Sequence, residues 1–154
     1  MAGRLLPTWF NGFESAGDRA QWFPTPAEAA GFDTEGGMAH SGIANGWVRP
    51  SDPGWKALNT IQPTGNTRHC VLTAWIAASS TVIRGPSDFA VWTLDVKEHL
   101  ADYVVQPGND GDYVPVTLCF DVPKEQQVLI DVGLWGADGW DQWIRVDDFS
   151  MTCF

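Results

Sequence analysis

Aromatic and acidic side chains are concentrated near the end of the sequence, and their types point to binding chemistry. Three tryptophans and four aspartates lie close together there: Trp135, Trp140, Trp143, Asp138, Asp141, Asp147 and Asp148. Indole rings stack on sugar rings and clustered carboxylates bind calcium, so a carbohydrate site and a calcium site are both candidates. A plain sandwich core with a solvated loop would use the same residue types.

The aspartates also raise the question of a hydrolase, because glycoside hydrolysis uses two carboxylates at a defined separation. Here all four belong to one turn and one strand, and no second segment offers an acid across a cleft. The sequence shows no nucleophile-elbow motif, no Cys–His pairing and no phosphate-cradling glycine loop. We therefore expect a protein that is not an enzyme.

Alternating apolar residues show which elements must position these side chains. They predict strands over 55–63, 69–79, 88–96, 113–122, 127–135 and 144–153. Turn-forming Gly, Pro, Asn and Asp residues separate the strands, and the only helix signals are weak ones at 25–32 and 95–104. About seven or eight short strands at this spacing predict an all-β antiparallel sandwich. With no repeat or linker, 1–154 is a single domain.

The last predicted strand contains a change of phase. Ile144 and Val146 share one alternation, whereas Phe149, Met151 and Cys153 share the other. All five side chains face the core only if a β-bulge lies between them, at 146–148. Such a bulge would change the direction in which the carboxylates of Asp147 and Asp148 point. In the alternative, one of the two apolar sets is exposed.

Composition narrows the range of partners. The net charge of −10 argues against nucleic acid, since phosphate binding needs clustered Lys and Arg. No apolar run is long enough to insert into a membrane. An acidic chain suits a hard cation or a neutral polymer. Nine tryptophans exceed the needs of one small core, so some should lie at the surface and mark a binding area.

The first residues do not read as a secretory signal, because their apolar stretch is very short. We expect an extracellular protein, from which a signal was removed or which leaves its cell as part of a virion. Cys70, Cys119 and Cys153 are an odd number, which allows one bridge and one free thiol or three free thiols.

Four motifs carry a resemblance to a known group of proteins. "NGFES" is followed by Trp22, and "AHSG" at 39–42, "CVLTAWI" at 70–76 and "WIRVDDFSM" at 143–151 come in the same order. Together they resemble the cellulase- and xylanase-associated carbohydrate-binding modules of families four, nine and twenty-two. This resemblance implies a galactose-binding-like jelly roll. It departs at Cys70, where a strand-opening Tyr is usual, and at 24–37.

The resemblance also implies a structural Ca²⁺ that ties the beginning of the chain to its last strand. Carried over, the carboxylates of Glu14 and Asp147 would be ligands, with the carbonyl of Gly12 and one near His40. Calcium takes six to eight oxygens and mixes carboxylates with carbonyls, so these donors suit it. Without the ion, Glu14 would cap a turn and Asp147 would be a solvated bulge residue.

A jelly roll implies one concave sheet, which would include 55–63, 88–96 and 127–135. By alternation, Trp92, Asp131 and Trp135 point away from the core on two of these strands, which the jelly-roll order makes neighbours. Two indoles with a carboxylate between them predict a carbohydrate platform. We expect Trp140 and Trp47 to wall its ends. The other candidates are assigned to packing or sheet edges: Trp22, Trp55, Trp75 and Trp143.

The jelly-roll order also bears on the cysteines, because it places 69–79 between the last strand and 113–122. Both Cys119 and Cys153 could then lie near Cys70. Cys70 and Cys153 point to the core while Cys119 points outward, and opposite faces do not allow a bridge. We predict a disulfide between Cys70 and Cys153, with Cys119 free.

Two functions from different classes follow. The first is non-catalytic binding of a neutral polysaccharide or surface glycan by exposed tryptophans on a calcium-stabilised jelly roll. The second is a structural or adhesion module of a virion or extracellular assembly, in which the exposed aromatic rings pack against neighbouring subunits.

Overall fold

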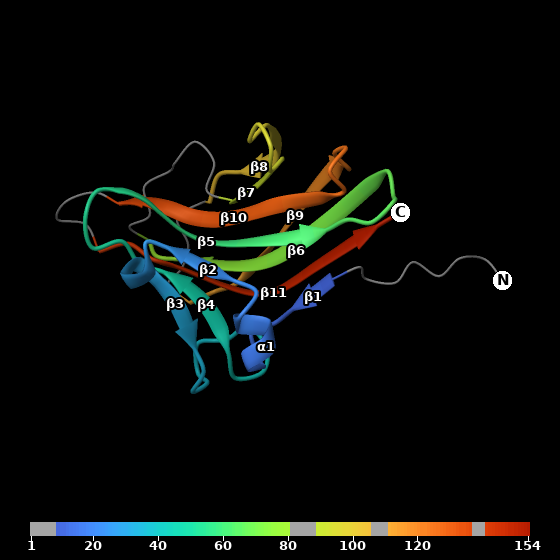
Figure 1. Ribbon diagram of the computed structural model, residues 1–154. Helices are drawn as coiled ribbons and strands as arrows, with labels where there is room; N and C mark the ends of the chain where they lie inside the picture. The colour runs from blue at the N-terminus through green and yellow to red at the C-terminus, as the bar shows by residue number, and fades with distance from the viewer. Residues whose placement is uncertain (1–8, 81–88, 106–110, 137–140) are drawn as a thin grey trace.

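The strands form two antiparallel sheets packed face to face, as Figure 1 shows. The computed structural model describes residues 9–80, 89–105, 111–136 and 141–154. Sheet A has the order β3 (Ala30–Asp33), β4 (Asn45–Val48), β11 (Ile144–Cys153), β6 (His69–Ala78), β9 (Val114–Asp121), and β1 (Trp9–Asn11) also pairs with β11. Sheet B has the order β2 (Phe23–Thr25), β5 (Gly54–Pro63), β10 (Gln127–Gly136), β7 (Phe89–Trp92), β8 (His99–Tyr103). The predicted antiparallel β-sandwich is confirmed.

Helical structure is sparse among the described residues. A short helix, α1 (Ala16–Arg19), was not predicted; it begins after Ser15, whose Oγ accepts a hydrogen bond from the amide of Asp18 at 3.0 Å. The weak signal at 25–32 corresponds to one 3₁₀ turn, η1 (Ala27–Ala29). The other weak signal, at 95–104, contains strand β8 instead. No helix in the described ranges is long and apolar enough to cross a membrane.

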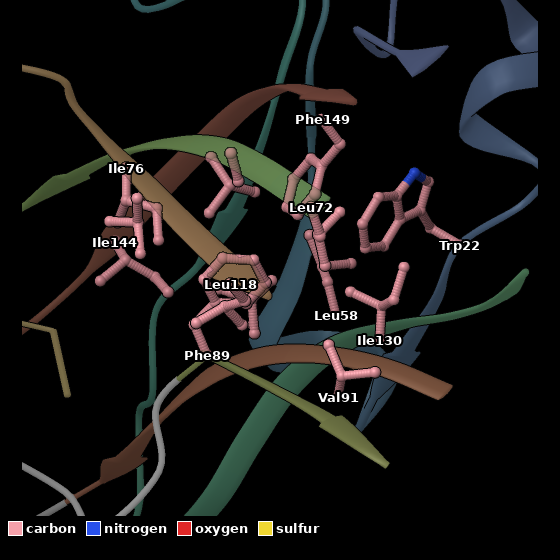
Figure 2. Close-up of a cluster of buried hydrophobic side chains, with 14 of the residues drawn as sticks. Trp22, Leu58, Leu72, Ile76, Phe89, Val91, Leu118, Ile130, Ile144 and Phe149 are labelled. Carbon is pink, nitrogen blue, oxygen red and sulfur yellow. The ribbon is translucent and has the colours of Figure 1, made fainter. Parts of the chain in front are cut away.

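The core lies between the sheets, and β6, β9 and β10 each contribute the apolar side chains of one alternation to it (Figure 2). On β6, Cys70, Leu72 and Ile76 are buried, and on β10, Ile130 and its phase-mates are fully buried. Each large apolar side chain removed from water contributes about 1.5–3 kcal/mol. The burial of alternate residues on β6 and β10 confirms the alternation predicted for 69–79 and 127–135. Val114, predicted to share the core phase of β9, is 52% exposed because it lies at the strand's first residue, beyond the sandwich interior.

The predicted bulge in the last strand is present. The pairing of β11 with β6 shifts register between Asp147 and Ser150, and Asp148 has a positive φ of 50°. Ile144 and Val146 before the shift and Phe149 after it all have no exposed surface. The extra residue lets both apolar phases of β11 face the core, and it leaves two adjacent aspartates at the kink.

Cys70 and Cys153 form the predicted disulfide. They are register partners on β6 and β11, with Cα atoms 4.1 Å apart. Cys119 on β9 is a free, exposed cysteine on the outward side of the same sheet. The bridge therefore joins two neighbouring strands of sheet A.

Candidate functional site

The outward side of sheet B brings together side chains from four strands. Cross-strand partners fall into rows, because residues directly opposite each other point to the same side of a sheet. One row joins Trp55 to Trp135, and a second joins Asn59 to Asp131. A third joins Leu129 to Trp92 on β7. We call the outward-facing residues of these rows the sheet B face.

Two indole rings meet at one end of the sheet B face. Trp55 on β5 and Trp135 on β10 have ring centroids 5.9 Å apart at an interplanar angle of 53°. Trp135 is 46% exposed and Trp55 is half-buried. Position 133, two residues before Trp135 on the same strand, is a glycine and has no side chain that could cover the rings. A Cβ there would lie 2.1 Å from the carbonyl oxygen of Lys56. The result is an aromatic surface that is open to solvent.

A second aromatic pair lies on β7 and β8. The imidazole of His99 and the indole of Trp92 have centroids 4.5 Å apart, and the two are register partners. Trp92 is half-buried, so it presents part of its ring rather than a free face. The contact with His99 fixes the indole on the edge side of sheet B.

Asp131 lies between these two aromatic pairs. Its side chain is half-buried, and its Oδ1 is shielded from water with no hydrogen-bond partner among the described residues. Asn59, directly opposite, donates to Oγ1 of Thr25 at 2.8 Å instead. Burial raises the pKa of Asp131 to about 7, and the charge of Lys97 opposes that rise. An unpartnered buried carboxylate oxygen is costly, so this position favours an additional hydrogen-bond donor.

The structure places Trp92, Asp131 and Trp135 on one face, as the alternation predicted. Trp47 was expected to wall that face, and this placement is wrong: Trp47 lies on β4, opposite Arg145 of β11, on the outward side of sheet A. The reason is long-range strand pairing, which alternation within one segment does not determine. Trp140 lies outside the described residues.

Trp55 also belongs to the sheet B face, although the sequence pattern had led us to assign it to packing or a sheet edge. Had the pairing of 55–63 with 127–135 been aligned, Trp55 would have fallen opposite Trp135.

The predicted calcium ligands meet at one place around the loop 40–44. The amides of Ile43 and Ala44 donate to Oε1 and Oε2 of Glu14 at 2.8 and 2.7 Å. The amides of His40 and Ser41 donate to Oδ2 of Asp147 at 3.0 and 3.2 Å. This loop therefore connects the segment after β1 with the bulge of β11.

Further contacts fix the second aspartate of the bulge. Asp148 accepts a hydrogen bond from the hydroxyl of Ser41 at 2.6 Å, and its Oδ2 lies 2.7 Å from Nδ1 of His40. The imidazole of His40 stacks on Trp75, with centroids 3.9 Å apart. Gly12 lies beside them, since a Cβ there would be 3.2 Å from Oδ1 of Asp148.

The donor types at this place fit calcium, although the contacts observed are hydrogen bonds. A carboxylate has about four lone-pair sites, of which Glu14 uses two and Asp147 three, the third for the amide of Asp148. The N–H of His40 donates to Asp147, so its carbonyl oxygen is the atom that could act as a ligand. Within the described ranges, no group of three or more His, Cys, Asp or Glu side chains is arranged to hold a metal. Carbonyls and water would have to supply most of the ligands.

Comparison with solved structures places the fold. TmCBM61, solved in complex with β-1,4-galactotriose, is 16% identical with a TM-score of 0.69, over 93% of this chain and 94% of that one. The CBM22-1 xylan-binding domain of Paenibacillus barcinonensis Xyn10C is 13% identical with a TM-score of 0.67, over 99% and 97%. TmCBM27, described for specific mannan recognition, is 12% identical with a TM-score of 0.63, over 99% of both chains.

The chain has the jelly-roll fold of carbohydrate-binding modules. No protein-family model and no curated protein matches the sequence, so the likeness is one of structure. The resemblance inferred from the four sequence motifs is confirmed at the level of fold. Because identities of this size show the fold alone, the role of this carbohydrate-binding-module fold must be argued from its own side chains.

Proposed function

We propose that the chain binds a neutral polysaccharide or glycan, without catalysis, through the sheet B face. The observation that carries this proposal is the position of Asp131, whose Oδ1 has no partner among the described residues. It lies between the Trp55–Trp135 pair and the Trp92–His99 pair. Small-molecule sites are typically lined by aromatic rings, with a few polar groups that fix the orientation of the ligand.

The chemistry of a sugar matches this arrangement. The C–H faces of a pyranose ring pack on indole π faces, while its hydroxyls need hydrogen-bond partners. Rotation of the Asp131 carboxylate would bring Oδ1, which is shielded and unpaired in this structure, to the surface, where a sugar hydroxyl would satisfy it. The net charge of −10 favours a neutral polymer over a polyanion.

The similar structures support the class of ligand. Their descriptions name β-1,4-galactotriose, xylan and mannan, which are all neutral saccharides. The aromatic pairs and the central carboxylate of this chain give no preference among the three. We therefore propose a neutral glycan as the ligand. Binding experiments with different polysaccharides will identify its sugar.

We further propose that Glu14 and Asp147 hold a structural Ca²⁺, with carbonyls such as those of Gly12 and His40. What supports this is the convergence of both carboxylates on the loop 40–44 and their remaining lone pairs. When bound, the ion would neutralise the two carboxylates and join the segment after β1 to β11. Asp147 is fully buried, and its burial raises its pKa to about 6, so a bound cation would favour the charged form of this carboxylate.

An extracellular location is part of the same proposal. The disulfide between Cys70 and Cys153 supports it, because structural disulfides persist in oxidising compartments. Polysaccharides that such a module would meet are also found outside cells.

A second candidate function, subunit packing in an extracellular assembly or virion, rests on exposed apolar side chains of sheet B. Phe23, Ile61 and Trp135 are each more than two-fifths exposed. Apolar surface of this kind also marks protein–protein contacts. Light scattering separates the candidates, since subunit packing predicts self-association that Trp135→Ala reduces, whereas a glycan-binding module stays monomeric.

Affinity electrophoresis in soluble galactan, xylan and galactomannan tests the leading proposal. We expect at least one polymer to retard the chain, and Trp135→Ala to remove most of the retardation. Phe10→Ala is a matched control, because Phe10 is 58% exposed on β1 of the other sheet. Equal mobility with and without all three polymers would exclude the proposal for these glycans.

A further inference from the structure

A hollow of about 370 Å³ lies on the outward side of sheet A, far from the sheet B face in the fold. Its lining includes Trp47, Trp143, Arg49, Arg145 and Asp33. Trp47 and Arg145 are register partners whose neighbours in sequence, Val48 and Ile144, are fully buried, so both point outward. The volume is within the range of sites for small ligands, about 300–1,000 Å³. We call it the sheet A hollow.

One wall of the sheet A hollow is shaped by a glycine. Gly31 on β3 is the register partner of Trp47, and a Cβ on Gly31 would lie 2.8 Å from Cζ2 of the indole. The ring therefore lies against bare backbone of the neighbouring strand. Any other residue at position 31 would displace the indole, so this wall depends on the pairing of glycine with tryptophan.

The second tryptophan positions a guanidinium group. The Cζ of Arg145 lies 4.0 Å from the ring centroid of Trp143, a cation–π contact. This stacking restrains the Arg145 side chain and leaves its N–H edge without a hydrogen-bond partner among the described residues. Arg49 is held by two hydrogen bonds to Asp141, from Nε and Nη2 at 3.0 Å each. Both cations are thus fixed near the hollow.

The hollow offers hydrogen-bond donors and one acceptor. The donors are guanidinium N–H groups, and the acceptor is the carboxylate of Asp33, which accepts no bond from a described side chain. Arg49 and Arg145 are balanced by Asp33 and Asp141, so the local charge is close to zero. A small ligand for this site needs an apolar face, hydroxyl groups that both donate and accept, and no net charge.

We propose that the sheet A hollow is a second carbohydrate-binding site, which takes a single neutral sugar unit or a disaccharide. The indole of Trp47 packs on the C–H face of the sugar ring. Asp33 accepts hydrogen bonds from sugar hydroxyls, and Arg145 donates to them. This site does not depend on the sheet B face, so it stands if the function proposed for that face fails.

An NMR titration of the whole chain with three probes, β-1,4-galactotriose, xylotriose and mannotriose, tests this site. We expect at least one probe at millimolar concentration to shift the indole N–H resonances of Trp47 and Trp143 saturably. The same shifts should persist in Trp135→Ala, which removes an indole from the sheet B face. Shifts confined to Trp55, Trp92 and Trp135 would support the sheet B face and overturn the second site.

Conservative variants separate binding from folding. Asp33→Asn keeps the side-chain size, and Arg145→Gln replaces the guanidinium by a shorter neutral amide. Each should weaken binding at the hollow by about tenfold, the loss expected for a hydrogen bond to a charged group. Gly31→Ala should weaken it as well by displacing Trp47. Phe10→Ala, an exposed aromatic elsewhere on sheet A, should leave it unchanged. Unshifted Trp47 and Trp143 resonances with all three probes, or unchanged affinity in both conservative variants, would refute the proposal.

Discussion

Trp55 and Trp135 lie directly opposite each other on β5 and β10, with ring centroids 5.9 Å apart. Because both indoles occupy one end of the sheet B face, they form a continuous aromatic surface from two strands. Neither strand alone supplies such a surface.

Trp135→Ala and Trp55→Ala should each weaken glycan binding by about tenfold to a hundredfold, as loss of a central aromatic anchor costs roughly 2 kcal/mol or more. Isothermal titration with the polymer that binds best measures this loss. Because the two rings contact each other, we expect the double variant to lose less than the product of the single effects. Full additivity would mean that the rings act as separate anchors.

Asp131 should make the unfolding free energy fall as pH rises from about 4 to 7. Its pKa is about 7 in the folded chain against an ordinary value of 3.8, so in this window the native state binds more protons than the unfolded state. Stability is thus highest below the unfolded pKa and is lost as pH rises through the folded pKa. Urea unfolding at several pH values, on wild type and Asp131→Asn, measures the effect.

In that experiment Asp131→Asn should lose part of the pH dependence, and the difference between the two curves isolates Asp131 from other acids. Parallel curves across the window would show that the Asp131 carboxyl titrates normally in the folded chain.

Reduction of the disulfide should destabilise the chain strongly. The bridge closes a sequence separation of 83 residues, for which loop-closure entropy predicts about 4.5 kcal/mol. We expect Cys70→Ala with Cys153→Ala to melt far below the wild type in differential scanning calorimetry. Cys119→Ser is the matched control, because Cys119 is free and exposed, and its melting temperature should match the wild type.

Chelation should lower the melting temperature if Glu14 and Asp147 hold calcium as proposed. Thermal melts with excess calcium and with EDTA measure the shift, and Glu14→Gln should abolish the difference between the two conditions. Asp121→Asn serves as a control, since Asp121 is an exposed acid on β9. Identical melting temperatures in calcium and EDTA would leave the loop 40–44 held by hydrogen bonds alone.

Features that depend on one segment at a time were predictable from the sequence. Alternation has a period of two, so it gave the core faces of 69–79 and 127–135 and placed Asp131 and Trp135 outward. The change of phase in β11 required a bulge for the same reason, and the register shift after Asp147 confirms it.

Features that depend on the pairing of distant strands were not predictable from alternation alone. Trp47 was assigned to the wrong sheet because its place depends on contacts with Arg145, about a hundred residues away along the chain. Trp55 was missed because only the register of β5 with β10 brings it to Trp135. The hydrogen bonds from the amides of the loop 40–44 also left no trace in residue type, since any backbone provides an N–H.

The position of β11 in sheet A has a consequence for biosynthesis. Although it is the latest strand in chain order, it lies inside the sheet, between β4 and β6, and it also pairs with β1. Until β11 leaves the ribosome, β4 and β6 have open edges toward each other and β1 has no strand to join. Sheet A must therefore close late, and a nascent chain stalled before Ile144 would expose unpaired strands to aggregation and to chaperones.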